Sequence, residues 1–180
     1  CTDMAFLRRG KDMRHVKTIS ILLAVLVLAS VLLAGCAQQQ AAPQSIKIGA
    51  VVSLTGAGSN VGKHMKQSAE LAVSEINAQG GVFVKAYNKK LPITLFVADD
   101  ETTPDSAVKA VTKLASEDKV DILVGGYSSA VTIATQGVVA ENKIPYVVTG
   151  ASSPDVTRKP GVDTSYIFHF CPTTAMYGQY

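Results

Sequence analysis

The chain has 180 residues, of which 47% are hydrophobic, 6% aromatic and 17% charged, a length that allows one domain with a sizeable core. The formal net charge is +3 at pH 7, but five of the 17 basic and two of the 14 acidic residues precede Cys36, so 12 of each follow from there. A neutral body without tryptophan has no basic stripe and few stacking side chains, which argues against nucleic acid as a partner.

The first segment of the chain predicts an export signal rather than a folded element. Arg14 and Lys17 precede an apolar run over residues 19–33 that only two serines interrupt. A run of this length is typical of the apolar part of a secretory signal peptide, and it is shorter than the roughly 20 residues of a bilayer-spanning helix. The alternative is a buried apolar helix.

The apolar run ends in Leu-Ala-Gly-Cys, a stretch that resembles a bacterial lipobox and closes at Cys36. Small residues before the cysteine would let a signal peptidase approach, and the thiol would carry the lipid. We therefore expect Met13 to be the initiator, residues 1–12 to be untranslated upstream sequence, residues 13–35 to be the signal peptide, and the mature protein to be exported and lipid-anchored through Cys36.

Residues 37–45, which are polar and lack an apolar period, predict a flexible tether. Beyond it, Cys171 has no cysteine partner, and a lone cysteine more often behaves as a small hydrophobic side chain than as a nucleophile. Its role stays open at this point. No Cys and His spacing resembles a metal site, so the sequence predicts neither a metal nor a cofactor.

From residue 46 onward, β-rich segments alternate with segments of helical apolar spacing. The predicted strands cover residues 46–54, 91–98, 121–124, 144–148 and 166–170. A predicted helix follows each of the first three strands. The first helix ends at Gly80-Gly81, the second starts at Thr103-Pro104, and the third covers residues 130–142. Alternation of this kind predicts an α/β fold, a doubly wound parallel sheet with helices on both faces.

Three loops rich in Gly, Ser and Thr follow predicted strands, at residues 55–62, 125–129 and 149–153. Parallel open sheets bind ligands at the carboxyl ends of their strands, so these loops are the candidate site. Ser128 and Ser129 stand where the third helix begins, and their hydroxyls suit an anionic group near a helix N-terminus. The competing interpretation is that either serine is only a helix cap.

Two enzymatic interpretations use the same loops. The glycine-rich loop at residues 56–62 resembles a dinucleotide fingerprint, but Asp99 and Asp100 lie about 40 residues further on rather than the usual 20 or so. The stretch around Ser128 resembles a hydrolase nucleophile elbow, with His169 as its base, but His169 lies within an apolar strand and no oxyanion loop is evident. A Rossmann domain and an exported serine hydrolase therefore remain the alternatives.

Several stretches, in this order and spacing, resemble the type I periplasmic binding proteins, in particular the branched-chain amino acid (Leu/Ile/Val-type) receptors of ABC transporters. They are residues 46–56 (IKIGAVVSLTG), 69–81 (AELAVSEINAQGG), 99–101 (DDE), 124–129 (VGGYSS) and 144–146 (IPY). The resemblance covers the chain from residue 46 onward. It implies a binding protein without enzymatic activity that delivers a small molecule to a membrane permease.

The resemblance also implies two α/β lobes that close on the ligand, so residues 46–180 would form the amino-terminal lobe of an incomplete two-lobe protein. It assigns the ligand carboxylate to Ser128 and Ser129, with Ser129 favoured. It assigns the carboxylate and amino groups to the later loop, at Gly150, Ala151 and Ser152. The pocket wall would be formed by Asn60, Val61 and Tyr127. It implies an amino acid or a related small carboxylate or amide as ligand.

Overall fold

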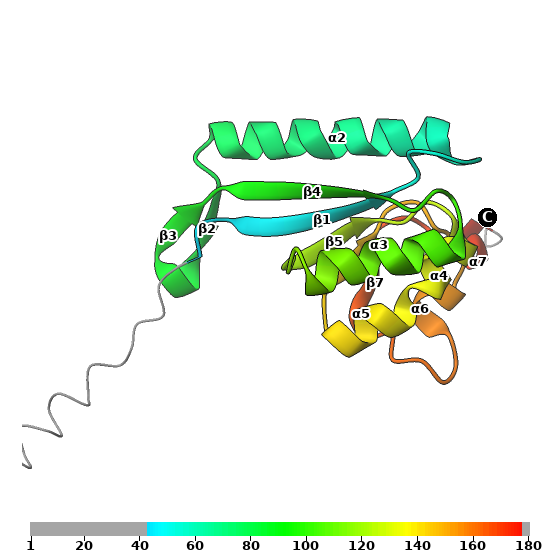
Figure 1. Cartoon of the computed structure of the whole chain (residues 1–180). Coiled ribbons are helices and arrows are strands. Elements are labelled where there is room, and N and C mark those ends of the chain that lie inside the picture. The colour runs from blue at the N-terminus through cyan, green and yellow to red at the C-terminus, as the bar shows by residue number, and fades with distance from the viewer. Residues whose placement is uncertain (1–42, 178–180) are drawn as a thin grey trace, which may run out of the picture. The chain divides into compact units, whose positions relative to one another are not determined.

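A computed structural model describes residues 43–177, and Figure 1 shows its ribbon. The predicted signal peptide, the lipidation site at Cys36 and most of the tether lie outside the described residues. Within residues 43–177, no helix combines the length and the apolar character that crossing a bilayer requires.

Five parallel strands form the central sheet in the order β4-β1-β5-β6-β7. Their bounds are β1 Ile46–Val52, β4 Ile93–Asp99, β5 Ile122–Gly125, β6 Tyr146–Val148 and β7 Ile167–His169. After β1, the chain first adds β4 on one side of β1. It then crosses to the other side of β1 and adds β5, β6 and β7 in turn. This reversal between β1 and β5 is the switch point at which open α/β sheets bind ligands. The predicted doubly wound parallel sheet is confirmed.

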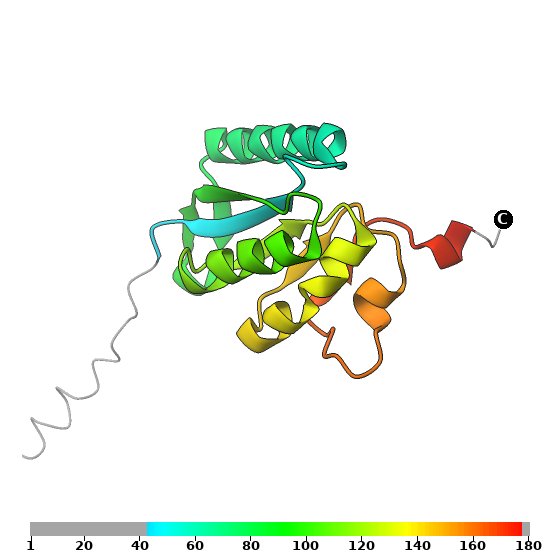
Figure 2. The ribbon, with the colours of Figure 1, turned by 45° about the vertical axis from the view of Figure 1, so that its right-hand side comes forward.

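Helices cover the two faces of this sheet unequally (Figures 1 and 2). One face carries α2 alone, over β1 and β4. The other face carries the remaining longer helices. The bounds are α2 Ser59–Ala78, α3 Pro104–Ser116, α4 Ser129–Ala134, α5 Gln136–Asn142, α6 Asp155–Arg158 and α7 Thr174–Tyr177.

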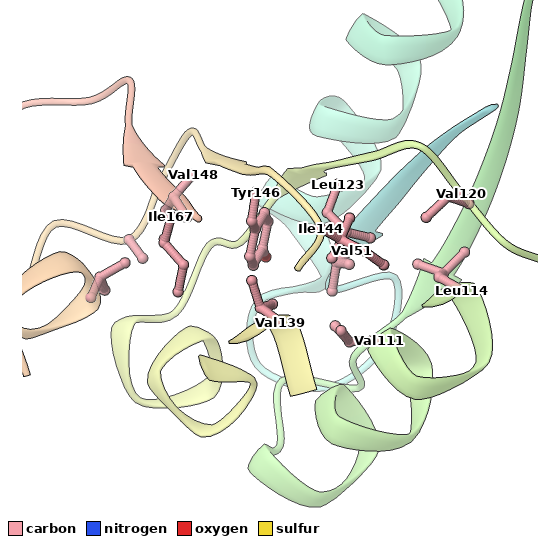
Figure 3. Close-up of a cluster of buried hydrophobic side chains, with 12 residues drawn as sticks. Val51, Val111, Leu114, Val120, Leu123, Val139, Ile144, Tyr146, Val148 and Ile167 are labelled. Atoms are coloured by element: carbon pink, nitrogen blue, oxygen red, sulfur yellow. The ribbon is translucent and has the colours of Figure 1, made fainter. Parts of the chain in front are cut away.

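The hydrophobic core lies between the sheet and the α3 side (Figure 3). Side chains from β1, β5, β6 and β7 meet side chains from α3 and α5 there. Leu114, Leu123 and Tyr146 are completely or almost completely buried. Close packing of this kind fixes the strands, and therefore the loops at their carboxyl ends, relative to one another.

The predicted helix boundaries follow the expected chemistry. Thr103 caps α3, because its side-chain oxygen accepts a hydrogen bond from the Ser106 N–H at 3.3 Å, and Pro104 occupies the first turn. Helix α2 ends before Gly80 and Gly81, which both have a φ of +88°. A residue with a side chain would be strained in this conformation, so the glycine pair stops the helix.

Two features differ from the predicted elements. A hairpin, β2 (Val82–Val84) and β3 (Lys89–Leu91) joined by the short helix η1 (Lys85–Tyr87), lies where a plain connection was expected. The helix predicted over residues 130–142 is divided into α4 and α5 at Thr135, whose hydroxyl donates to the Thr132 carbonyl at 2.8 Å. This local hydrogen bond competes with the regular helical pattern.

Candidate ligand-binding site

The three predicted loops meet at the carboxyl end of the sheet, and Tyr127 joins them. Its ring lies between the β1 loop and the β6 loop: a Cβ atom added to Gly58 would be 3.0 Å from its Cδ1, and one added to Gly150 would be 3.5 Å from its Cδ2. A side chain at position 58 would crowd the ring, whereas one at position 150 would be in ordinary van der Waals contact with it. Tyr127 itself is 37% exposed, so part of it faces the solvent at the edge where a ligand would lie.

Asp99, at the end of β4, holds the β1 loop in place. Its carboxylate accepts hydrogen bonds from the Leu54 N–H (2.7 Å), the Thr55 hydroxyl (2.7 Å) and the Thr55 N–H (3.3 Å). It also accepts one from the Glu101 N–H at 2.8 Å. Burial raises the pKa of Asp99, but these hydrogen bonds outweigh it and hold the pKa below its usual value.

Asp100 lies beneath the same loop and is completely buried. Its Oδ1 accepts hydrogen bonds from the Ser53 hydroxyl at 2.6 Å and from the Thr102 N–H at 2.8 Å. Among residues 43–177, its Oδ2 has no hydrogen-bond partner, and neither does the buried hydroxyl of Tyr146. Burial, together with the negative charge of Asp100, raises the pKa of Tyr146 far above its usual range.

The Tyr146 hydroxyl supports the β5 loop from below. A Cβ atom on Gly126, which has a φ of +72°, would lie 2.6 Å from this hydroxyl and 2.9 Å from the Thr132 Oγ1. Thr132 lies close enough to moderate the pKa of Tyr146, but its hydroxyl donates to the Ser128 carbonyl at 2.9 Å. This buried polar cluster of Ser53, Asp100, Thr132 and Tyr146 was not among the predicted site residues.

Ser128 and Ser129 differ in what their hydroxyls do. Ser128 is the N-cap residue of α4, but its side chain makes no capping hydrogen bond. Ser129 Oγ accepts a hydrogen bond from the Ser153 N–H at 3.1 Å and so links α4 to the β6 loop. Because α4 has only six residues, its dipole adds less to anion binding than the sequence suggested.

In the β6 loop, the backbone N–H groups of Gly150 and Ala151 both donate to the Gly126 carbonyl, at 3.1 and 2.8 Å. The Ala151 side chain is completely buried in the core. These two N–H groups are therefore occupied within the protein. Ser152 is half-buried, and within residues 43–177 its hydroxyl has no recorded intramolecular partner, which leaves it available to a ligand.

Asn60 and Val61 lie in the first turn of α2. Val61 lines a groove of about 770 Å³ between α2 and the sheet, which Tyr127, Thr149 and Gly150 border at the carboxyl end. The rest of this groove is mostly apolar, with side chains from β1, β4 and β5 opposite those of α2, among which His64 and Ser68 are polar. Of the predicted site residues, Val61, Tyr127 and Gly150 line this groove. Its lining does not include Asn60, Ser128, Ser129, Ala151 or Ser152.

His169 and Cys171 contact the β6 loop from the end of β7. His169 Nε2 lies 3.2 Å from the Ser153 carbonyl oxygen, and the free thiol of Cys171 lies 3.4 Å from the Ala151 carbonyl oxygen. In the described part of the chain, the His169 ring thus contacts the Ser153 carbonyl and makes no hydrogen bond to Ser128. In residues 43–177, no group of three or more His, Cys, Asp or Glu side chains is placed to hold a metal ion.

Comparison with known proteins identifies the family. A family model described as periplasmic binding protein matches residues 45–179. The chain belongs to the periplasmic binding protein family. Its members are solute-binding proteins that are exported to the periplasm or the extracellular side, which agrees with a ligand site at the switch point of the sheet.

Curated periplasmic binding proteins resemble the chain over most of its length. The Leu/Ile/Val-binding protein BraC3 of Rhizobium johnstonii is 33% identical over 132 residues, which is 73% of this chain and 34% of the relative. Leu/Ile/Val-binding protein homolog 2 of Brucella abortus is 31% identical over 114 residues, 63% of this chain and 29% of the relative. The chain thus spans about a third of the length of the curated relatives it matches.

Solved structures agree on the fold. The branched-chain amino acid transporter substrate binding protein LivJ from Streptococcus pneumoniae, in complex with isoleucine, has a TM-score of 0.63 and 26% identity, covering 72% of this chain and 34% of that one. A solute binding protein of an ABC transporter from Rhodopseudomonas palustris, in complex with 3,4-dihydroxybenzoic acid, has a TM-score of 0.60 and 24% identity, covering 73% and 33%.

Proposed function

We propose that the chain is the amino-terminal lobe of an exported, lipid-anchored substrate-binding protein that captures a small organic carboxylate, in first place a branched-chain amino acid. The bound solute is delivered to the permease of an ABC importer, and the protein itself catalyses no reaction. The observation that carries this proposal is the meeting of the β1, β5 and β6 loops around Tyr127 at the switch point of the sheet.

The ligand class follows from the groups that the loops offer. Ser128 and Ser152 lie in the loops beside the groove, and within residues 43–177 their hydroxyls have no protein partner, so both can donate hydrogen bonds to a carboxylate. Of the described residues, no Asp, Glu, Lys or Arg lines the groove. The ligands named for the two solved relatives, isoleucine and 3,4-dihydroxybenzoic acid, both carry a carboxylate. We therefore assign the carboxylate to Ser128 and Ser152, and the apolar remainder of the ligand to the wall formed by Tyr127, Val61 and Asn60.

Ser129, Gly150 and Ala151 have a supporting role in this proposal. Their polar groups hold the β5 and β6 loops together through the Ser153 N–H and the Gly126 carbonyl. Preorganised loops lose less conformational freedom when the ligand binds, which increases affinity. Ser129 Oγ accepts the Ser153 N–H, which leaves its own O–H able to donate to the carboxylate as the resemblance implies, and Ser152 is added as a further donor.

Isothermal titration calorimetry of the full-length protein tests the ligand class. We expect saturable binding of leucine, isoleucine or valine, and no binding of their amides or of the corresponding amines, because the carboxylate would be missing. A matched series with hydroxybenzoates separates the two kinds of carboxylate ligand. Tight binding of a neutral sugar with no response to any carboxylate would contradict the proposal.

Metabolic labelling with a fatty-acid analogue tests the anchor. The wild-type protein should carry the label in the membrane fraction, and Cys36→Ser should carry none. Cys171→Ser is the matched control, because it removes the other cysteine after the predicted signal peptide and should leave labelling unchanged. Equal labelling of wild type and Cys36→Ser would overturn the lipidation site.

A further inference from the structure

The hairpin formed by β2, η1 and β3 projects from the sheet and is almost entirely exposed. Of residues 82–90, only Val84 is partly buried, and the exposed ones include three large hydrophobic side chains. They are Val82 (39% exposed), Phe83 (56%) and Tyr87 (39%). Exposed aromatic residues on a single protruding hairpin differ from the scattered hydrophobic residues of an ordinary surface.

The hairpin is also purely cationic. Residues 76–98 contain Lys85, Lys89 and Lys90 but no acidic residue. Lys90 donates to the Gln79 carbonyl at 2.8 Å, and Lys85 and Lys89 make no ion pair within residues 43–177. The acidic residue that precedes this segment is the exposed Glu75, one turn before Gln79 on α2. Asp118 and Asp121 are engaged with other groups, Asp118 with Lys113 and Asp121 with the Lys47 N–H.

Apolar and cationic side chains occur on both faces of the hairpin: Phe83 and Lys90 share one face, and Lys89 lies with Val84 on the other. Phe83 pairs directly with Lys90 across the two strands, and directly opposed residues project on the same face. Val84 pairs with Lys89, while Val82 pairs with Leu91, which is buried and fixes the hairpin to the body. Aromatic side chains beside lysines suit the boundary between lipid headgroups and acyl chains, where the ring enters and the ammonium groups meet phosphates.

The chain enters the folded body next to this hairpin. The Ile46 N–H donates to the Pro92 carbonyl at 2.8 Å, one residue after β3 ends. Both views of the ribbon place the hairpin beside the amino end of β1 (Figures 1 and 2). Ile46 lies ten positions after Cys36, a span of at most about 35 Å. A lipid on Cys36 would therefore hold the hairpin close to the bilayer surface.

We propose that the hairpin docks the protein on an anionic phospholipid surface, with Lys85 and Lys89 on the headgroup phosphates and Phe83 at the acyl boundary. This proposal rests on the lipid anchor at Cys36 for its local concentration. Because the hairpin lies at the amino ends of the strands, docking there would turn the ligand loops toward the aqueous side. The docked state is thus suited to capturing solute.

Lysine footprinting of the lipidated full-length protein tests the proposal. The protein is reconstituted into phosphatidylcholine vesicles, into vesicles with equal phosphatidylcholine and phosphatidylglycerol, and into detergent micelles, and acetylation rates are measured by mass spectrometry. We expect Lys85 and Lys89 to react at least fivefold more slowly on the anionic vesicles, with recovery in high salt. The exposed Lys63 and Lys109, on α2 and α3, should react equally in all samples.

Matched variants sharpen this test. The double variant Lys85→Gln, Lys89→Gln should reduce the ratio of docked to free protein about 25-fold, because each lysine near an anionic surface contributes roughly a fivefold factor. The acetylation rate of Lys90 reports this ratio in the variant. Lys63→Gln with Lys109→Gln changes the net charge equally and should have no effect. Phe83→Ser should weaken docking on the anionic vesicles while the salt dependence remains.

Equal rates on neutral and anionic vesicles would overturn the docking surface. Protection that is already complete in detergent would also overturn it, because the hairpin would then be covered by the rest of the protein. The mass of the peptide that begins at Cys36 reports the anchor in the same samples. If that peptide lacks lipid, the anchor fails separately, and added anionic vesicles must still protect Lys85 and Lys89 for the docking proposal to stand.

Discussion

The two faces of the central sheet differ in how completely helices cover them: one face forms the hydrophobic core, and the other remains accessible to solvent. On the α3 face, helices α3 to α6 close over the strands and bury Leu114, Leu123 and Tyr146. On the α2 face, a single helix leaves a groove of about 770 Å³ and exposes Phe168 and Phe170 of the β7 end. Packing on the α3 face therefore holds the strands in place, and the α2 face leaves the ligand loops accessible at the carboxyl end of the sheet.

The alternation along β7 shows how one strand serves both faces. Ile167 points into the closed core, whereas Phe168 is 52% exposed on the opposite side. Successive side chains of a strand point to opposite faces of the sheet, so an apolar pattern alone does not say which of them is covered. The difference lies in which helices pack on each face.

The largest expected effect comes from truncating a side chain of the closed face. Leu114→Ala removes a side chain that is 1% exposed and should lower the free energy of unfolding by about 2–5 kcal/mol, since a cavity remains. The matched change Leu95→Ala, on the groove side, should cost about 1 kcal/mol because solvent already reaches that side chain. Urea unfolding of both variants checks this. Equal losses would show that the faces do not differ.

A second, smaller effect concerns the junction of the closed face and the β5 loop. Gly126→Ala should cost about 2–3 kcal/mol, because its φ is +72° and the new Cβ would meet the Tyr146 hydroxyl at 2.6 Å. Tyr146→Phe should raise stability by about 1 kcal/mol, since it removes a buried hydroxyl that has no partner. A double-mutant cycle by thermal and chemical unfolding should give a coupling of at least about 0.5 kcal/mol.

A loss of stability in Tyr146→Phe would contradict this account of the junction, because it would mean that the hydroxyl is hydrogen-bonded. Additive effects in the double variant would mean that Gly126 is required only for its backbone conformation. Val148→Ala is a suitable control for the cycle, since Val148 lies in the same strand and core, whereas the side chains next to Gly126 are those of Tyr146 and Thr132.

The smallest effect concerns the open edge of the sheet. The pKa of Asp99 is lowered in the folded protein, so its carboxylate stabilises the fold above the pKa of an unfolded Asp, and this contribution disappears as the pH falls through the folded pKa. Asp99→Asn should therefore cost about 1 kcal/mol or less at pH 7, given solvent screening, and progressively less toward pH 2. Denaturation at several pH values checks this, and a constant difference would contradict it.

Much of the fold followed from patterns that are local in the sequence. The strand at the start of the folded body, the cap at Thr103 and the stop at Gly80 each depend on residues within a few positions, and the structure confirms them. The hairpin over residues 82–91 did not follow, because its lysines interrupt the apolar alternation that marks a strand. The third helix is divided at Thr135, where a threonine hydroxyl bonds a backbone carbonyl, and the apolar periodicity does not predict such a break.

The candidate site was predictable as three loops but not as individual contacts. The carboxyl-end rule identifies the loops, yet it does not show that the N–H groups of Gly150 and Ala151 are bonded to Gly126. It also does not show that Ser129 serves Ser153 while the Ser152 hydroxyl stays free. These contacts join segments about 24 residues apart, and only the packed structure brings them together. The Asp100 and Tyr146 pair beneath the loops arises in the same way.

Ligand-induced stabilisation of Ser152→Ala, measured on the full-length protein with the amino acid that calorimetry identifies, tests the site most directly. We expect an unchanged thermal midpoint without ligand, and an affinity about 10- to 100-fold weaker, because a hydrogen bond to a charged group contributes about 1.5–3 kcal/mol. The rise of the midpoint with ligand should shrink accordingly. A lower midpoint without ligand and an unchanged affinity would show that Ser152 only supports the loop, and would contradict the proposed carboxylate site.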